Sequence, residues 1–188
     1  MSDRRLSQAI AEGDGISVLV HVEHADDVRA GETQGAEGVV VRGAGLFGSV
    51  ALPVLAYGPT PEEAASLGAH AVVLSVDEDE DGLASLVERA ADLGLEWVAR
   101  VRDEDDLERV LERLDPEVIL LVADGRAEDQ EALERLLELL PDVPAGKLAI
   151  AELSVASRAD VVELERAGVD AVLVTGDVDG LVDASPEV

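Results

Sequence analysis

The sequence contains no cysteine, few aromatic residues and a single lysine. Without cysteine the chain can form neither a disulfide nor a thiolate metal site, which fits a cytoplasmic protein. Aromatic residues make up only 2% of the chain, so valine, leucine, alanine and isoleucine must fill any core. No apolar run approaches the roughly 18 residues of a membrane span, and the chain does not begin with a basic region followed by an apolar stretch. We therefore expect no membrane association and no signal peptide.

Positive charge is also scarce. The chain has 42 acidic and 14 basic residues, which gives a formal net charge of −28. No basic face is available to release phosphate counterions, so nucleic acid is not an expected partner. Repulsion between carboxylates destabilises a compact state at low salt, and a salt-rich cytoplasm would screen it. The composition therefore indicates either a halophilic protein or an ordinary acidic protein from a high-GC genome.

The length of 188 residues is enough for one good core and short for two. Apolar residues make up 47% of the chain, which is too much for a disordered acidic tail. No linker-like stretch divides the sequence. We predict a single domain over residues 1–188, in which residues 1–14 form an N-terminal helical extension.

One junction recurs three times along the chain. It reads GAEGVVV at Gly35–Val41, GAHAVVL at Gly68–Leu74 and GVDAVLV at Gly168–Val174. In each copy an acidic helical segment ends at glycine, and an apolar, β-branched run follows. Continuous apolar runs are typical of parallel strands that are buried on both faces.

Eight such runs predict eight strands, with amphipathic helices between most of them. The runs are Ile16–Val22, Gly38–Arg42, Leu52–Tyr57, Ala71–Val76, Trp97–Val101, Val118–Ala123, Leu148–Leu153 and Ala171–Thr175. Thr60 and Ser157 have the sequence context of helix N-caps. We predict an α/β fold, a compact (β/α)8 TIM barrel. Only about nine residues separate the second and third strands, too few for a helical crossover, so the helix there is expected to be missing. The alternative is an open doubly wound parallel sheet with fewer strands.

Five segments stand in a consistent order along the chain. They are Gly45–Ser49, Leu52–Leu55, Trp97–Glu108, Ala151–Ser157 and Arg166–Val174. Together they resemble the strands and active-site loops of indole-3-glycerol phosphate synthase, the ring-closing lyase of tryptophan biosynthesis. The resemblance covers roughly residues 16–178, with the second helix and the first active-site loop trimmed. It implies a barrel whose site lies at the carboxyl ends of the strands.

Other residues occupy most of the positions at which that family carries its catalytic groups. The family's first strand carries Glu-x-Lys, where this chain has His21-Val22-Glu23. The third-strand lysine, which the resemblance implies is the general acid, falls at Tyr57 or Ala56. The fifth-strand glutamate is replaced by Arg100.

The later strands follow the same trend. The sixth-strand asparagine becomes Ala123 beside Asp124, and the phosphate-binding Gly-Glu-Ser of the eighth strand appears as Thr175-Gly176-Asp177. Only the seventh-strand glutamate is matched, by Glu152. The single lysine, Lys147, precedes the seventh strand and so falls on the face opposite the chemistry. Ring closure needs a proton donor, a base and a cationic surrounding for carboxylate and phosphate, so we expect the family's usual activity to be absent.

Polar residues at the strand ends should meet around one mouth of the barrel. The catalytic candidates are Glu152, Tyr57 and His21, and the ligand-binding candidates are Arg42, Arg100, Asp124, Thr175 and Gly176. The two arginines could clamp a carboxylate or phosphate. Alternatively, both pair with Glu152, Asp124 or neighbouring acids and only stabilise a polar pocket.

Two motifs contain acidic or histidine side chains of the kind that bind metal ions. His21 and Glu23 share a strand face, with His24 following, but three neighbouring ligands do not define a site. The acidic run Asp77–Gly82 lacks the alternating spacing of an EF-hand loop. We therefore expect no metal and no cofactor.

Two hypotheses follow for function. In the first, the chain is a synthase-like barrel without synthase chemistry that binds a small anionic metabolite or acts as an interaction module. In the second, it is a lyase or isomerase with a rebuilt site for a small phosphorylated or carboxylated metabolite, with Tyr57 or His21 as acid/base and Arg100 as anion clamp. A homodimer through the apolar flank left by the missing helix is a further expectation.

The charge balance predicts that stability depends on salt. The melting temperature should rise steeply between about 0.1 M and about 2 M KCl, because the Debye length falls to about 3 Å at molar salt and the carboxylates stop repelling one another. Thermal denaturation followed by circular dichroism across a KCl series measures this. A melting temperature that stays flat over the series would contradict the prediction.

Overall fold

Eight parallel strands form a closed barrel in the computed structural model, which describes residues 5–13, 15–23, 25–42, 50–76, 80–123, 129–153, 157–175 and 181. Neighbouring strands pair in chain order, and β8 pairs back to β1. The strands are β1 (Ser17–Val22), β2 (Gly38–Arg42), β3 (Val54–Tyr57), β4 (Ala71–Ser75), β5 (Glu96–Val101), β6 (Val118–Val122), β7 (Leu148–Leu153) and β8 (Ala171–Thr175). The predicted (β/α)8 TIM barrel is confirmed, and the open doubly wound sheet is wrong.

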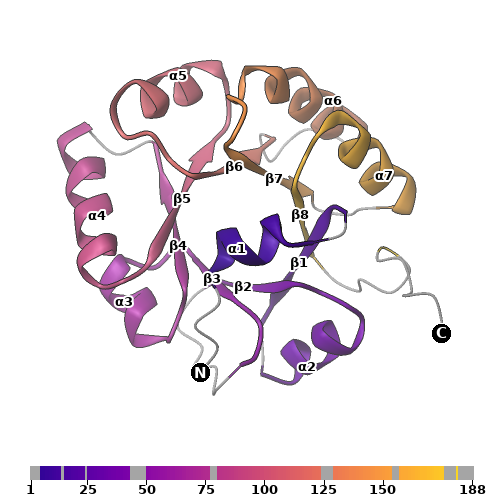
Figure 1. Ribbon diagram of the computed structural model, residues 1–188, viewed down its shortest axis with the longest axis horizontal. Coiled ribbons are helices and arrows are strands. Elements are labelled where there is room, and N and C mark those ends of the chain that lie inside the picture. The colour runs from indigo at the N-terminus through magenta and orange to yellow at the C-terminus, as the bar shows by residue number, and fades with distance from the viewer. Residues whose placement is uncertain are drawn as a thin grey trace.

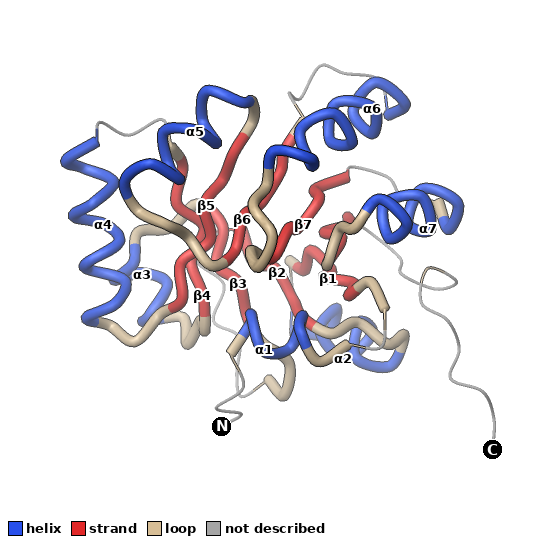
Figure 2. Tube along the Cα trace, turned by 45° about the horizontal axis from the view of Figure 1, so that its top comes forward, coloured by secondary structure: helices blue, strands red, loops and turns tan. Residues whose placement is uncertain are grey.

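Within the described residues, six helices surround the strands (Figures 1 and 2). They are α2 (Ala25–Thr33), α3 (Pro61–Ser66), α4 (Glu80–Asp92), α5 (Glu104–Arg113), α6 (Asp129–Leu139) and α7 (Arg158–Ala167), and a 3-10 turn, Leu140–Asp142, follows α6. Between β2 and β3 only residues 50–53 are described and they form no helix; residues 43–49 lie outside the described part, so the missing helix stays a prediction. None of the described helices is both long enough and apolar enough to cross a membrane.

Each strand is buried on both faces, which explains the continuous apolar runs in the sequence. One set of alternate residues, including Leu19, Leu55 and Ile150, fills the barrel interior. The other set, including Val72 and Ile119, packs against the helices. Because side chains alternate along a strand, membership of the interior set fixes which polar residues at the strand ends also point inward.

The capping residues predicted from the sequence lie at the ends of the helices. Thr60 and Ser157 both form capping boxes at the starts of α3 and α7. Gly168 ends α7 with φ = 101°, a left-handed conformation that a side chain would strain. The third strand begins at Val54, two residues later than predicted, because Pro53 has no N–H to donate to the sheet and contributes only its carbonyl, which accepts from Val39.

A short helix, α1 (Leu6–Ala11), lies across the N-terminal end of the barrel (Figure 1). Its Leu6 and Ile10 side chains join the interior core cluster. Glu96, the first residue of β5, accepts hydrogen bonds from the backbone N–H of Leu6 at 2.6 Å and of Ser7 at 3.3 Å. The Ser7 hydroxyl donates to the same carboxylate. The carboxylate therefore satisfies N–H groups that no turn of α1 can reach.

The flank formed by β2 and β3, where a helix is expected to be missing, is not an exposed apolar surface. The outward-facing side chains of β2 and β3, namely Val39, Val41, Val54 and Ala56, are all buried. The structural reason given for a homodimer is therefore removed, and the homodimer itself stays an untested prediction.

The packing of α1 predicts a large cost for truncating its buried face. Leu6→Ala should lower the free energy of unfolding by about 2–5 kcal/mol, because Leu6 is 1% exposed and a cavity would open at the end of the barrel. Urea denaturation measures the change. The matched control is Leu93→Ala, since Leu93 is 40% exposed, and it should cost less than about 1 kcal/mol. Equal losses from the two variants would show that α1 does not close the barrel.

Candidate functional site

The carboxyl ends of the strands present one ring of inward-facing side chains. Each of these residues lies two positions after a residue of the interior core, so its side chain points the same way. The ring consists of His21, Arg42, Tyr57, Ser75, Arg100, Val122, Glu152 and Thr175, which we call the mouth ring. It includes six of the eight site residues predicted from the sequence. The other two, Asp124 and Gly176, lie outside the described residues.

Four of these residues are linked by direct contacts across the barrel. Arg42 Nη2 donates to Glu152 Oε1, and the Tyr57 hydroxyl donates to Glu152 Oε2 at 3.2 Å. The same hydroxyl accepts from Arg100 Nε at 2.8 Å. The four side chains come from β2, β3, β5 and β7, so the predicted convergence of distant polar residues is confirmed. We call these four residues the mouth network.

Arg42 makes a second contact within the network. Its guanidinium carbon lies 4.1 Å from the centroid of the Tyr57 ring, a cation–π geometry. The Arg42 side chain is 46% exposed, whereas that of Glu152 is 18% exposed. Arg42 thus lies between the less exposed carboxylate of Glu152 and the solvent. The ion pair between Arg42 and Glu152 is the contact expected if the arginines neutralise the acids of the mouth.

The resemblance left the third-strand position open between Tyr57 and Ala56. Tyr57 points into the barrel and packs against the interior cluster, while Ala56 is buried on the helix side. Tyr57 therefore takes the inward place. Burial raises the pKa of the Tyr57 phenol, as does the charge of Glu152, and the opposing effects of Arg100 and Arg42 are smaller. A tyrosine in this state remains protonated at neutral pH and can donate a proton or hydrogen bond, but it is a poor base.

His21 occupies the mouth ring on β1, beside Thr175 of β8, with which it is in register. Burial lowers the pKa of His21, and the positive charge of Arg42 lowers it further, against smaller upward effects of Glu23 and Glu152. The imidazole is therefore neutral at neutral pH. Its Nε2 atom is buried and has no hydrogen-bond partner among the described residues.

A pocket of about 390 Å³ opens beside this part of the ring. His21, Glu23 and Thr175 line it together with the helix-side residues Val20 and Val22 and residues of α2, so it lies between the end of β1 and α2, and no member of the mouth network lines it. A volume of this size suits a small metabolite.

Two polar features of the strand ends were not singled out from the sequence. Ser75 ends β4 in register with Arg100, and counting two residues from the interior Val73 would have found it. Asp106 is fully buried at the start of α5. Burial alone would raise the pKa of Asp106, but hydrogen bonds and charge from Arg102, with Arg109, lower it below its usual value. Arg102 is thus engaged in supporting α5.

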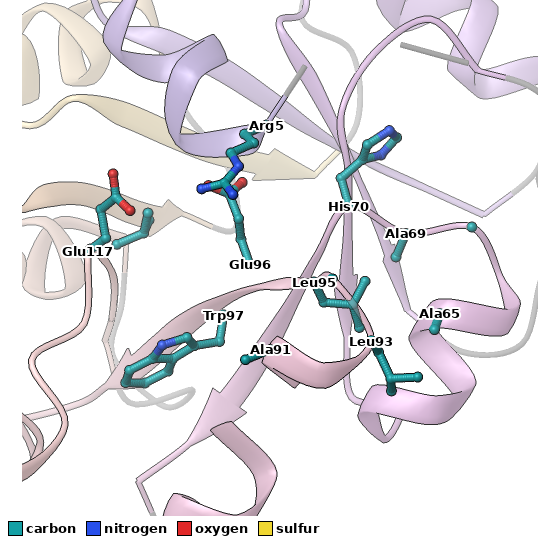
Figure 3. A pocket seen from close by; sticks show the side chains of 13 residues that line it. Arg5, Ala65, Ala69, His70, Ala91, Leu93, Leu95, Glu96, Trp97 and Glu117 are labelled. Atoms are coloured by element: carbon teal, nitrogen blue, oxygen red, sulfur yellow. The ribbon is translucent and has the colours of Figure 1, made fainter. Parts of the chain in front are cut away.

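A larger pocket, of about 690 Å³, lies at the opposite end of the molecule. In the view of Figure 3 it is lined by the apolar side chains of Leu93, Leu95 and Trp97 below Arg5 and His70. These residues belong to strand starts and helix ends, where barrels of this fold do not carry their chemistry. We therefore place the candidate site at the mouth ring.

Lys147 also lies at that opposite end, as predicted. It immediately precedes β7, and its Nζ atom pairs with Asp115 Oδ1 at 2.5 Å. Since it is the only lysine in the sequence, no lysine is present in the mouth ring.

No group of three or more histidine, cysteine, aspartate or glutamate side chains in the described part of the chain is arranged to hold a metal ion. His24 and Asp77, which belong to the motifs weighed as metal sites, lie outside the described residues. The expectation of no metal stays a prediction.

Comparison with known families shows which family the sequence resembles. The family model described as indole-3-glycerol phosphate synthase matches residues 61–181, which is more than half of the chain. The matched stretch begins at α3 and includes β4 to β8, and with them the positions of Arg100, Glu152 and Thr175.

The mouth network predicts an unusual titration for the single tyrosine of the chain. The Tyr57 phenol should ionise above about pH 10, the usual value, because burial and the Glu152 charge disfavour the phenolate. Glu152→Gln should lower the midpoint, since it removes the negative charge. Ultraviolet absorbance of the phenolate measures both, with circular dichroism to confirm that the protein stays folded.

The matched control for this titration is Glu62→Gln. Glu62 also pairs with an arginine, Arg89, but on the outside of the barrel. The control should leave the midpoint of Tyr57 unchanged. If Glu152→Gln raised the midpoint or left it in place, the hydrogen bond and charge assigned to Glu152 would be wrong.

Proposed function

Because the chain belongs to the indole-3-glycerol phosphate synthase family, we propose that it is a member without the family's ring-closing reaction, and that it binds a small anion at the mouth of its barrel. The observation that carries the proposal is the mouth network, in which two arginines, a tyrosine and a glutamate from four strands are joined by hydrogen bonds.

The loss of the reaction is supported by what fills the family's catalytic positions. Tyr57 stands where the resemblance leads one to expect the general-acid lysine, and Arg100 stands where it leads one to expect a glutamate. The reaction needs both a proton donor and a base. Tyr57 can donate, but both Glu152 oxygens accept hydrogen bonds within the network. Glu152 is thus engaged within the network, and Arg100, which stands at the position of the family's fifth-strand glutamate, cannot act as a base.

The binding of an anion is supported by the local charge. Among the described residues of the mouth ring, Arg42 and Arg100 are positive and only Glu152 is negative. This excess of positive charge is unusual in a chain whose formal net charge is −28. A ligand carboxylate or phosphate could replace Glu152 as the partner of Arg42, so that the guanidinium exchanges one oxyanion for another, while Glu152 keeps its hydrogen bond from Tyr57.

A second candidate function is an enzyme with a rebuilt site. It is favoured by one observation, namely that Tyr57 holds a proton in a buried position between a carboxylate and a guanidinium. In that case Tyr57 would act as general acid on a substrate held by Arg100, with His21 as the alternative acid/base group.

Anion binding predicts ligand-dependent stabilisation. Inorganic phosphate and small dicarboxylates such as malonate should raise the melting temperature relative to KCl at the same ionic strength, which removes the general effect of salt on an acidic protein. Arg100→Ala should weaken binding about tenfold or more, because it removes a charge-assisted contact. Arg89→Ala, which removes an arginine from an exposed ion pair on the outer surface, should leave binding unchanged.

Two results would count against the proposal. If Arg100→Ala retained every ligand-induced shift, the assigned clamp would be wrong. Robust turnover of the carboxyphenylamino deoxyribulose phosphate substrate by the unmodified protein would show that ring closure survives, and would favour an enzyme.

A further inference from the structure

His21 is the one member of the mouth ring with a buried polar atom, Nε2, that has no partner in the described part of the chain. Buried polar atoms are almost always hydrogen-bonded, and an exception marks a place where a missing group belongs. The imidazole faces the barrel interior two positions after the core residue Leu19. The residue also borders the pocket of about 390 Å³ between the end of β1 and α2.

The charged groups around His21 come from several elements. Arg42 on β2 acts on it most strongly, followed by Glu23, which comes directly after β1, and Glu152 on β7. On the side of α2, Asp27 and the neutral Gln34 line the same pocket. From β8 the only described neighbour in the ring is Thr175, which carries no charge.

We propose that His21 is a second contact of the anion bound at the mouth, that it donates a hydrogen bond from Nε2 to one oxygen of that anion, and that it takes up one proton from solvent as the anion binds. This inference rests on the proposed anion binding and adds a binding residue and a proton to it. The ligand class is an oxyanion, either a carboxylate or a phosphate-like group.

The electrostatics explain why the proton should arrive with the ligand. Without a ligand, burial and the Arg42 charge both disfavour the imidazolium. A bound oxyanion offsets the charge of Arg42 and accepts a hydrogen bond from the protonated ring, and both effects favour the charged form. A neutral ligand would not offset the charge of Arg42, and a cationic ligand would add to it. The orphan Nε2 therefore matches an oxyanion better than any other class of ligand.

The sign of the resulting pH dependence follows from linkage. If binding raises the pKa of His21, then the complex holds more protons than the free protein, and the affinity increases as the pH falls. Over the interval between the two pKa values, one linked proton changes the affinity by up to about tenfold per pH unit.

Sulfate is the probe of choice because its charge does not change in this range. Isothermal titration calorimetry at constant ionic strength should show tighter sulfate binding as the pH is lowered from about 8 to about 5.5, where an unperturbed histidine titrates. Repeating the titration in buffers of different ionisation enthalpy should reveal an uptake that approaches one proton. His21→Gln keeps a hydrogen-bonding amide but cannot titrate, so it should retain binding and lose the uptake. His70→Gln is the matched control, since His70 is a half-buried histidine at the opposite end of the barrel, and it should behave like the unmodified protein.

The outcomes separate the two claims. If neither sulfate nor phosphate binds the unmodified protein at any pH, the proposed function fails. If both anions bind but His21→Gln shows the same proton uptake as the unmodified protein, the role of His21 is wrong and anion binding stands. Should His21→Gln fail to fold, NMR titration of the His21 ring decides. The pKa should lie below that of a free histidine without sulfate and rise when sulfate is added, and an unchanged value overturns the inference.

Discussion

The closure of eight parallel strands into a ring is the constraint on which the site depends. Along each strand alternate side chains point inward, and all eight strands run in the same direction, so each contributes one inward side chain near its carboxyl end. Arg42 and Glu152 are separated by 110 positions in the sequence and still form an ion pair. Shifting the register of one strand by one residue would turn its contribution to the helix side and break the mouth network.

Within this frame the network satisfies the hydrogen bonds of its carboxylate and its phenol. Glu152 uses one oxygen for Arg42 and the other for Tyr57, and the Tyr57 hydroxyl is both donor and acceptor. Such a chain is stable only when every member has its partner, because an unpaired group in a poorly solvated site is costly. The composition of the mouth therefore departs from that of the outer surface, where carboxylates greatly outnumber basic groups. A ligand must compete with an internal partner, and this competition selects for anions.

The sequence was sufficient for the barrel and for the position of most of the site. The eight apolar runs and the glycine junctions are local signals, and the structure keeps their boundaries to within two residues, with Pro53 responsible for the difference at β3. Counting alternate residues also places Arg42, Tyr57, Arg100 and Glu152 on the inward face.

Which groups would pair could not be read from the sequence. With 42 acidic residues in the chain, many partners were available to each arginine, and the choice depends on distances across the barrel. Arg102 illustrates the difficulty, because it follows Arg100 by two positions and yet binds Asp106 at the start of α5. Asp106 is buried, but in the sequence it stands in the acidic run Asp103–Asp106, which is typical of an exposed segment. The unpartnered nitrogen of His21 is likewise a property of three-dimensional surroundings.

The attachment of α1 has a consequence for the order in which the molecule is assembled. The backbone N–H of Leu6 finds its acceptor in Glu96, ninety positions later. During synthesis the helix emerges before the strand that holds it, so its apolar face must wait until β5 has been made and added to the sheet. The helix α1 is thus made early and packed late. A ribosome-bound intermediate that stops short of β5 carries Leu6 and Ile10 without the Glu96 carboxylate that holds α1.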